Sequence, residues 1–146
     1  MNGKIADKIA EIERYLLELG SFSPATFHEY EKNIEKKAAS ERYFEKIVEA
    51  SVDLAFLIIK EDHLTIPEEE KETFDLLTKE GIISVELAAK LKNAKGMRNI
   101  LAHEYGIVDD SIVFASITEE LNEDIGKFLE MVNSYQNRKL GRKKLL

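Results

Sequence analysis

The stretch FEKIVEASVDLAFLII, residues 44–59, decides the fold of this chain. Its apolar side chains recur every three or four residues, which is the spacing of one face of an α-helix. A helix with so broad an apolar face has to be covered by other elements, so we predict that it lies at the centre of the domain. The face consists of Phe44, Ile47, Val48, Ser51, Leu54, Ala55 and Ile58, and Leu57 and Ile59 widen it.

The rest of the chain shows the same helical period and lacks the alternation typical of strands. We expect a first helix over residues 4–19, ended by Gly20, and two helical pieces within residues 24–61. Residues 28–37 are highly polar, so this part should be exposed.

Further helices are expected over residues 67–79, with Pro67 in the first turn and Gly81 after the end, and over residues 85–95, capped by Ser84. Gly96 should break or bend the latter helix. The last helix should cover residues 111–135, with a cap from Asp109 or Asp110 and a stripe made of Phe114, Ile117, Leu121, Ile125, Phe128, Val132 and Tyr135.

Several amphipathic helices with short connections predict an all-α fold, an antiparallel helical bundle. With 146 residues the chain is long enough for one domain with its own core. We assign that domain to residues 1–137 and treat residues 138–146 as a C-terminal tail.

Composition limits the function classes. The chain has no cysteine, which excludes a disulfide framework and a thiolate metal site. No apolar run approaches the ~18 residues of a membrane span, and the N-terminus has no apolar signal core, so we expect a soluble cytoplasmic protein without a membrane partner. The net charge of −7 argues against a broad nucleic-acid-binding surface.

Charge is unevenly distributed, however. The last nine residues carry five positive charges and no acid, which leaves residues 1–137 with a net charge of −12. The tail, which contains Arg138, Lys139, Arg142, Lys143 and Lys144, is either a solvated, frayed end or an arm that touches RNA or an acidic partner.

The stretch RNILAHEY, residues 98–105, gathers the side chains best suited to catalysis. Arginine binds phosphate oxygens in a forked geometry, and histidine exchanges protons near neutral pH. Arg98 and His103 could therefore act on phosphate, with Asn99 beside them. The alternative is structural: side chains near a helix end can cap carbonyl groups and fill an interface.

The spacing of these residues constrains the site. Five residues along a helix correspond to about 500°, so Arg98 and His103 are offset by roughly 140° and do not share a face. Either the helix ends near His103, or a second copy of the chain supplies the other half of the site. Gly106 suits a helix C-terminus, which favours a protonated imidazole.

The longer stretch GMRNILAHEYGIVD, residues 96–109, closely resembles the signature of the HepT-like branch of the HEPN superfamily, an R-N-x3-H-x-Y motif followed by a V-D pair. A looser likeness extends over residues 4–135. The resemblance implies a HEPN-like, homodimeric, metal-independent endoribonuclease. Such a protein is the toxin of a toxin–antitoxin pair, with a minimal nucleotidyltransferase as antitoxin.

The resemblance also implies roles for single residues. Arg98 and His103 match the catalytic pair, Asn99 the polar position beside it, and Tyr105 the tyrosine that the nucleotidyltransferase modifies by AMPylation. In the absence of the family, Tyr105 would simply pack at the helix end with its hydroxyl hydrogen-bonded.

Two acids in the central stretch could support the motif. Glu49 is either a carboxylate at the edge of the apolar face or a buried acid that orients Arg98 or His103, and Asp53 could share that role. The segment 46–51 resembles the apolar helix of the family that carries an inward glutamate.

We expect no metal and no cofactor. His28 and His63 lie far from the motif and lack a second histidine at helical spacing, and the chain has no phosphate-binding glycine loop or dinucleotide fingerprint.

Three functions follow from these observations. The first is an endoribonuclease in which the 2′-hydroxyl of the RNA is the nucleophile. The second is a non-catalytic dimeric HEPN module that binds a nucleotide or docks a nucleotidyltransferase. The third is a helical scaffold in which Arg98 and His103 contribute only to stability.

Overall fold

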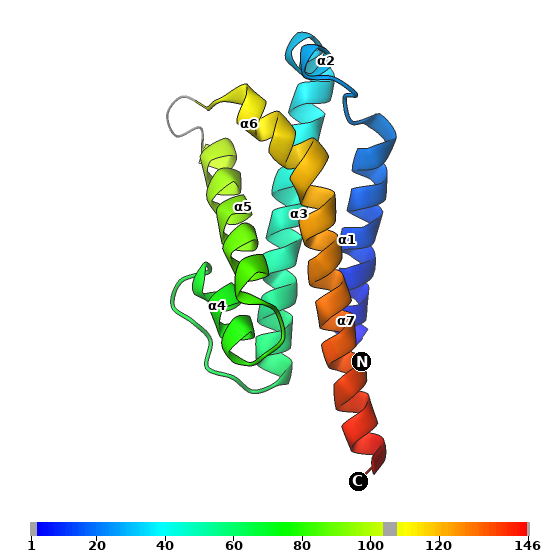
Figure 1. Ribbon diagram of the computed structural model, residues 1–146, viewed down its shortest axis with the longest axis vertical. Helices are drawn as coiled ribbons and strands as arrows, with labels where there is room; N and C mark the ends of the chain where they lie inside the picture. Colours follow the sequence, from blue (N-terminus) through cyan, green and yellow to red (C-terminus); the bar gives the residue numbers. More distant parts are fainter. Residues whose placement is uncertain (1–2, 104–107, 146) are drawn as a thin grey trace.

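The computed structural model describes residues 3–103 and 108–145, and within these ranges all regular structure is helical. The predicted all-α fold is therefore confirmed (Figure 1). The elements are α1 (Gly3–Phe22), α2 (Phe27–Lys32), α3 (Ile34–Glu61), α4 (Glu72–Lys79), α5 (Val85–His103), α6 (Asp110–Ala115), the π-helical turn η1 (Ser116–Glu120) and α7 (Leu121–Leu145).

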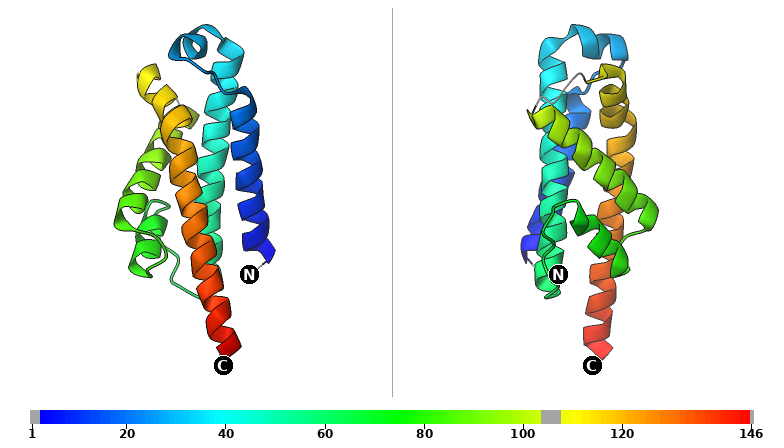
Figure 2. Two further views of the ribbon diagram at one scale, coloured as in Figure 1. Left: turned by 45° about the vertical axis from the view of Figure 1, so that its right-hand side comes forward. Right: turned by 90° about the vertical axis from the view of Figure 1, so that its left-hand side faces the viewer.

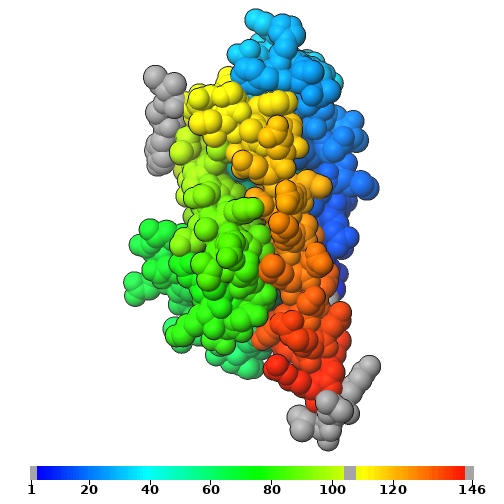
Figure 3. Space-filling model, viewed as in Figure 1, coloured from blue at the N-terminus to red at the C-terminus, as the bar shows by residue number. Residues whose placement is uncertain are grey.

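The long helices run alternately up and down, so the bundle is antiparallel as predicted (Figure 1). Helix α3 is its centre, because it packs against α1, α2, α4, α5 and η1. Helix α5 crosses α3 obliquely, as the right-hand view of Figure 2 shows. On the face seen in Figure 3, α5 and α7 lie against each other.

The central stretch behaves as its pattern predicts. The whole apolar face that we assigned to residues 44–58 is buried, and Ile59 is buried as well. The predicted stripe of the last helix also faces the core: Ile117, Leu121, Ile125, Phe128 and Val132 are buried, and Phe114 and Tyr135 are partly buried against them. In the polar region 28–37, only Tyr30 is buried, and it donates a hydrogen bond to Glu41 at 2.9 Å.

The predicted end of the first helix was wrong, because α1 continues past Gly20 to Phe22. The Phe22 ring packs edge-on against Tyr43 of α3, with ring centroids 5.2 Å apart. The backbone N–H of Ser23 donates to the carbonyl of Leu19, which completes the last turn. A packing contact thus outweighs the weak helix propensity of glycine, which costs about 1 kcal/mol.

The predicted break at Gly96 was also wrong, since α5 runs without interruption from Val85 to His103. The residues beside the glycine are held by tertiary contacts. Lys95 forms an ion pair with Glu70 at 3.2 Å, and Met97 packs against the core.

Helix α4 begins at Glu72 and not at Pro67. The carbonyls of Glu69 and Glu70 accept hydrogen bonds from residues three positions later, which is the geometry of a tight turn. Glu70 is drawn toward Lys95, so the acids that follow Pro67 do not form a first helical turn.

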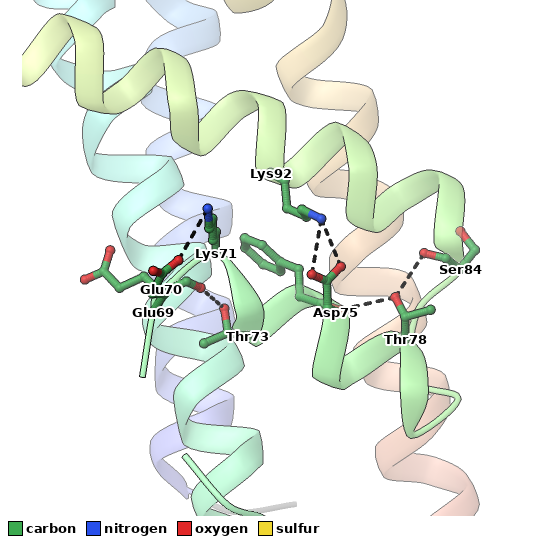
Figure 4. A network of polar contacts seen from close by, with 9 residues as sticks. Glu69, Glu70, Lys71, Thr73, Asp75, Thr78, Ser84 and Lys92 are labelled. Atoms are coloured by element: carbon green, nitrogen blue, oxygen red, sulfur yellow. Dashed lines mark hydrogen bonds and ion pairs between the residues drawn. The ribbon is translucent and has the colours of Figure 1, made fainter. Parts of the chain in front are cut away.

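The short helix α4 is fastened to α5 by the polar contacts drawn in Figure 4. Lys92 of α5 reaches both carboxylate oxygens of Asp75, at 3.1 and 3.2 Å. The predicted stop at Gly81 is confirmed, because this residue has a φ of +74°, a conformation that favours glycine. Ser84 caps α5 as predicted, through a bond from the N–H of Leu87 at 3.1 Å.

The last predicted helix begins with the expected cap: the Asp109 carboxylate accepts from the N–H of Ser111 at 2.9 Å. It comprises α6, η1 and α7, and it extends to Leu145 instead of residue 135. Most of the basic tail is therefore helical. No break separates residue 137 from the tail.

A polar cluster joins the ends of α3 and α7, and we call it the Asp62 cluster. Asp62 accepts from the Tyr135 hydroxyl and pairs with Lys139. Gln136, which is buried, donates to Glu61 at 3.3 Å. Burial and the bond to Asp62 raise the pKa of Tyr135 to about 12.

Within the described ranges, no helix is both long and apolar enough to cross a membrane.

Candidate active site

Arg98 lies on α5, where its guanidinium faces the central helix α3. Its side chain is 23% exposed, and one guanidinium nitrogen lies 3.6 Å from the Glu49 carboxylate. Another nitrogen donates to the side-chain oxygen of the neighbouring Asn99 at 3.0 Å. The cation is thus half-buried and held from two sides, and the distance to Glu49 exceeds that of a close charged hydrogen bond.

Arg98 belongs to a wider group of charges between α3, α5 and the segment before α4. We call this group the charged seam; it consists of Glu49, Asp53, Glu70, Lys95 and Arg98. These side chains, with Val48 and Val52, line a small cavity of about 60 Å³. The seam alternates two cations with three acids, so a phosphate that enters has to compete with carboxylates for the guanidinium.

Glu49 is not the buried acid that one of our two interpretations required. Its side chain is 53% exposed, although it follows two buried residues, Ile47 and Val48. It lies at the edge of the apolar face, as the other interpretation stated. It nevertheless faces Arg98, so the structure brings these two predicted residues together.

Asp53 lies one turn further along α3 and does not contact the motif directly. Its nearest cation is Lys8 of α1, at 3.8 Å. Loss of solvent around the carboxyl raises the pKa of Asp53 above its ordinary value; Lys8 opposes this shift, and the carboxylates of Glu49, Glu11 and Glu70 add to it.

His103 is the last residue of α5 and is exposed. Since no helix break intervenes, Arg98 and His103 lie on one continuous helix, and the roughly 140° offset between them applies. Along the helix axis they are separated by only about 7.5 Å. Both side chains therefore belong to the C-terminal part of α5 but leave the helix in different directions.

Tyr105, the predicted site of modification, lies outside the described residues, as do Glu104 and Gly106.

Lys95 is a part of the seam that the sequence analysis missed. It precedes Arg98 by three residues and therefore lies on the same face of α5. Its side chain is only 12% exposed and pairs with Glu70 at 3.2 Å. The spacing to Arg98 was visible in the sequence, but the contact with the segment before α4 was not.

A larger groove, of about 440 Å³, lies between α5 and the η1–α7 segment and contains none of the predicted site residues. Its rim carries Glu120, Glu123 and Asp124 against a single lysine, Lys90. This sign of charge is unsuited to a polyanion, so the charged seam is the better candidate for phosphate chemistry.

The described residues contain no group of three or more His, Asp or Glu side chains that could hold a metal ion.

Comparison with known proteins gives a consistent result. The sequence profile of the family described as ribonuclease HepT-like matches residues 5–132. The chain is 29% identical to the tRNA nuclease HepT of Aphanizomenon flos-aquae over 131 residues, which are 90% of this chain and 88% of the relative. It is 26% identical to the mRNA nuclease HepT of Shewanella oneidensis over 134 residues, which are 92% of this chain and 99% of the relative.

Among solved structures, the fold is similar to that of a tri-AMPylated HEPN toxin of Shewanella oneidensis in complex with an MNT antitoxin. The TM-score is 0.85 at 26% sequence identity, and the superposition covers 92% of this chain and 99% of the other.

Proposed function

The chain belongs to the ribonuclease HepT-like family, and from this premise we propose that it is an endoribonuclease whose active site is the Arg98-x4-His103 pair. The observation that carries the proposal is the state of Arg98. Its guanidinium is half-buried, yet its carboxylate partner is more than half exposed and 3.6 Å away. Such a cation can exchange a weakly held carboxylate for a phosphate.

The residues have separate roles in the proposed reaction. Arg98 binds the scissile phosphate and stabilises the negative charge that develops during in-line attack. His103 takes the proton from the 2′-hydroxyl or gives one to the leaving oxygen. Asn99 already accepts a hydrogen bond from Arg98 and so fixes the guanidinium, while its amide can donate to the phosphate. Glu49 and Asp53 support the arrangement from α3.

The nucleophile in this scheme is the 2′-hydroxyl of the substrate itself, so the reaction needs no metal-activated water and DNA is not cleaved. The 2′-oxygen bonds to phosphorus as the P–O5′ bond breaks, which leaves a 2′,3′-cyclic phosphate, and the 5′-oxygen leaves with a proton.

We further propose that the protein works as a homodimer in the cytoplasm. Arg98 and His103 diverge on α5, and a second copy placed against this end of the bundle can bring His103 of one protomer toward Arg98 of the other. A two-fold axis produces two such pairs in one cleft.

The proposed regulation acts on Tyr105. A nucleotidyltransferase antitoxin would transfer AMP from ATP to the phenol oxygen, with release of pyrophosphate. Tyr105 follows Arg98 by only seven residues in the sequence, so we propose that the new phosphate and the RNA phosphate compete for one guanidinium. The modified solved relative supports this step. Intact-mass analysis should show the added AMP on the wild type and none on Tyr105→Phe; equal mass shifts on both would contradict the assignment.

The proposed activity is tested with purified protein and labelled RNA in the presence of EDTA. We expect cleavage by the wild type and by His28→Ala, which removes another exposed histidine, on α2, but none by His103→Ala. Binding of RNA without cleavage by the wild type would instead favour the non-catalytic module. Cleavage by His103→Ala would overturn the assignment of the site.

A further inference from the structure

The exposed end of α7 combines a high positive charge with a fixed position. Residues 138–145 continue the helix, and we call this segment the basic arm. Its cations Arg138, Arg142 and Lys143 are exposed, and none forms an ion pair among the described side chains. Arg138 and Arg142 are four residues apart and so lie on one face of the helix.

The arm is not a loose tail, because the Asp62 cluster anchors its base. Lys139 lies within the arm but is bound to Asp62 and Glu61, the latter at 3.5 Å. Gln136 and Tyr135, one turn before, also bind the end of α3. The arm therefore emerges from the body in a defined direction. Its three exposed cations form no ion pair among the described side chains, and Arg138 also lies over the Tyr135 ring, 5.9 Å from its centroid.

The arm projects beyond the rest of the bundle, as both views in Figure 2 and the lower part of Figure 1 show. Helix α5, whose last residue is His103, ends toward the opposite end of the bundle from the arm (Figure 1). Helix α7 alone has 25 residues, a length of about 37 Å. A ligand that touches both the arm and the Arg98–His103 site has to be a large molecule.

The distribution of charge over the chain indicates which kind of ligand the basic arm binds. The remainder of the chain has a net charge of −12 and repels a polyanion, except where cations are concentrated. An unpaired, helical group of arginine and lysine side chains is suited to phosphate groups along a nucleic-acid backbone.

We infer that the basic arm is a second RNA-binding surface, remote from the cleavage site, which holds the backbone of a long or folded RNA while another part of the same RNA is cut. The inference rests on the proposed function for the identity of the RNA as substrate. It adds that the enzyme distinguishes substrates by size and shape through a surface that takes no part in the chemistry.

The test compares two substrates and three variants. The arm variant is Arg138→Gln/Arg142→Gln/Lys143→Gln. A charge-matched control, Arg14→Gln/Lys32→Gln/Lys127→Gln, removes three exposed cations elsewhere, and a charge-keeping control is Arg138→Lys/Arg142→Lys/Lys143→Arg. Each is assayed on a folded RNA of tRNA size and on a tetranucleotide that can fill only the cleft.

For the arm variant, we expect kcat/KM on folded RNA to fall by roughly tenfold relative to kcat/KM on the tetranucleotide. The cause should be a higher KM for folded RNA. The slope of log KM against log salt concentration should decrease by about 2, because each lost phosphate contact removes roughly 0.7–0.9. Both controls should keep the wild-type ratio. An unchanged ratio in the arm variant, or an equal loss in the charge-matched control, would overturn the inference.

Binding measured in a His103→Ala background separates this inference from the proposed function. If folded RNA binds less tightly only when the arm charges are removed, the arm is confirmed even if the wild type proves inactive. If removal of the arm charges leaves RNA binding unchanged but weakens binding to an acidic protein partner, the arm is a protein-docking element and the inference is wrong.

Discussion

The charged seam and the Asp62 cluster use the same kinds of side chain in opposite ways. Their central cations are equally covered, with Arg98 23% and Lys139 22% exposed. Their carboxylates differ: the Glu49 side chain is 53% exposed, whereas that of Asp62 is 13% exposed and also accepts from Tyr135. A covered cation with a covered, saturated anion joins two helices. A covered cation with an exposed, distant anion can bind a ligand.

The largest expected effect is loss of RNA cleavage in Arg98→Ala and in His103→Ala. Removal of a charge-stabilising or proton-transferring group lowers kcat by roughly 10² to 10⁴. Because both side chains are at least partly exposed, the midpoint of thermal unfolding should stay close to that of the wild type. Gel assays of cleavage and circular dichroism melts measure the two quantities. If the variants instead showed a large fall in melting temperature and a proportionate loss of activity, the side chains would have a structural role and not a catalytic one.

The opposite result is expected at the Asp62 cluster. Asp62→Ala leaves Tyr135 and Lys139 without their shared acceptor, which should lower the free energy of unfolding by about 1–3 kcal/mol. Cleavage of a tetranucleotide per folded molecule should persist. Urea unfolding is the measurement, and Asp75→Ala is the matched control, since it breaks an exposed pair with Lys92 worth about 0.2–1 kcal/mol. Equal losses in the two variants would mean that the covered Asp62 cluster stabilises the fold no more than an exposed ion pair does.

A smaller effect is expected from Glu49→Gln, which keeps the shape of the side chain but removes its charge. Since Glu49 in the proposed site only helps to orient Arg98, kcat on RNA should fall by less than tenfold, and the free energy of unfolding should not change measurably. Steady-state kinetics measure kcat, and urea unfolding measures the free energy of unfolding and the folded fraction. A loss as deep as that of Arg98→Ala would assign Glu49 a direct role in the reaction.

The smallest effect concerns pH. The pKa of Asp53 is raised in the folded protein, so the native state holds its proton to higher pH than the unfolded chain does. Its contribution to stability is therefore lost as pH rises from the ordinary aspartate range through the raised value. Asp53→Asn should remove this slope and gain less than about 1 kcal/mol at neutral pH, because the carboxyl is half exposed. Urea midpoints measured between mildly acidic and neutral pH test this, and a steeper slope in the variant would contradict the direction.

The sequence predicted the fold well where local pattern controls it. The central apolar stretch, the Ser84 and Asp109 caps and the stop at Gly81 depend on residues close in the chain, and all are confirmed. The predicted ends of the first and last helices were wrong because contacts between residues distant in sequence determine where these helices end. Phe22 packs on Tyr43, and Lys139, beyond the predicted end of the last helix, pairs with Asp62, 77 residues earlier.

The same limit applies to the candidate site. The motif placed Arg98, Asn99 and His103 on one helix, but the pairing of Lys95 with Glu70 depends on the path of the segment before α4. Glu49 could have been placed at the edge of the apolar face from the sequence. Glu45, Glu49 and Asp53 recur every four residues and form a polar line of their own.

We propose that each catalytic site combines Arg98 of one protomer with His103 of the other, and mixing of subunits tests this arrangement. Arg98→Ala and His103→Ala chains are each inactive alone and are then unfolded together and refolded as a mixture. If the site is shared, half of the dimers are mixed and each has one intact site of two, so about a quarter of the wild-type RNA cleavage should return. If mixed dimers form and cleavage does not return, the claim is contradicted.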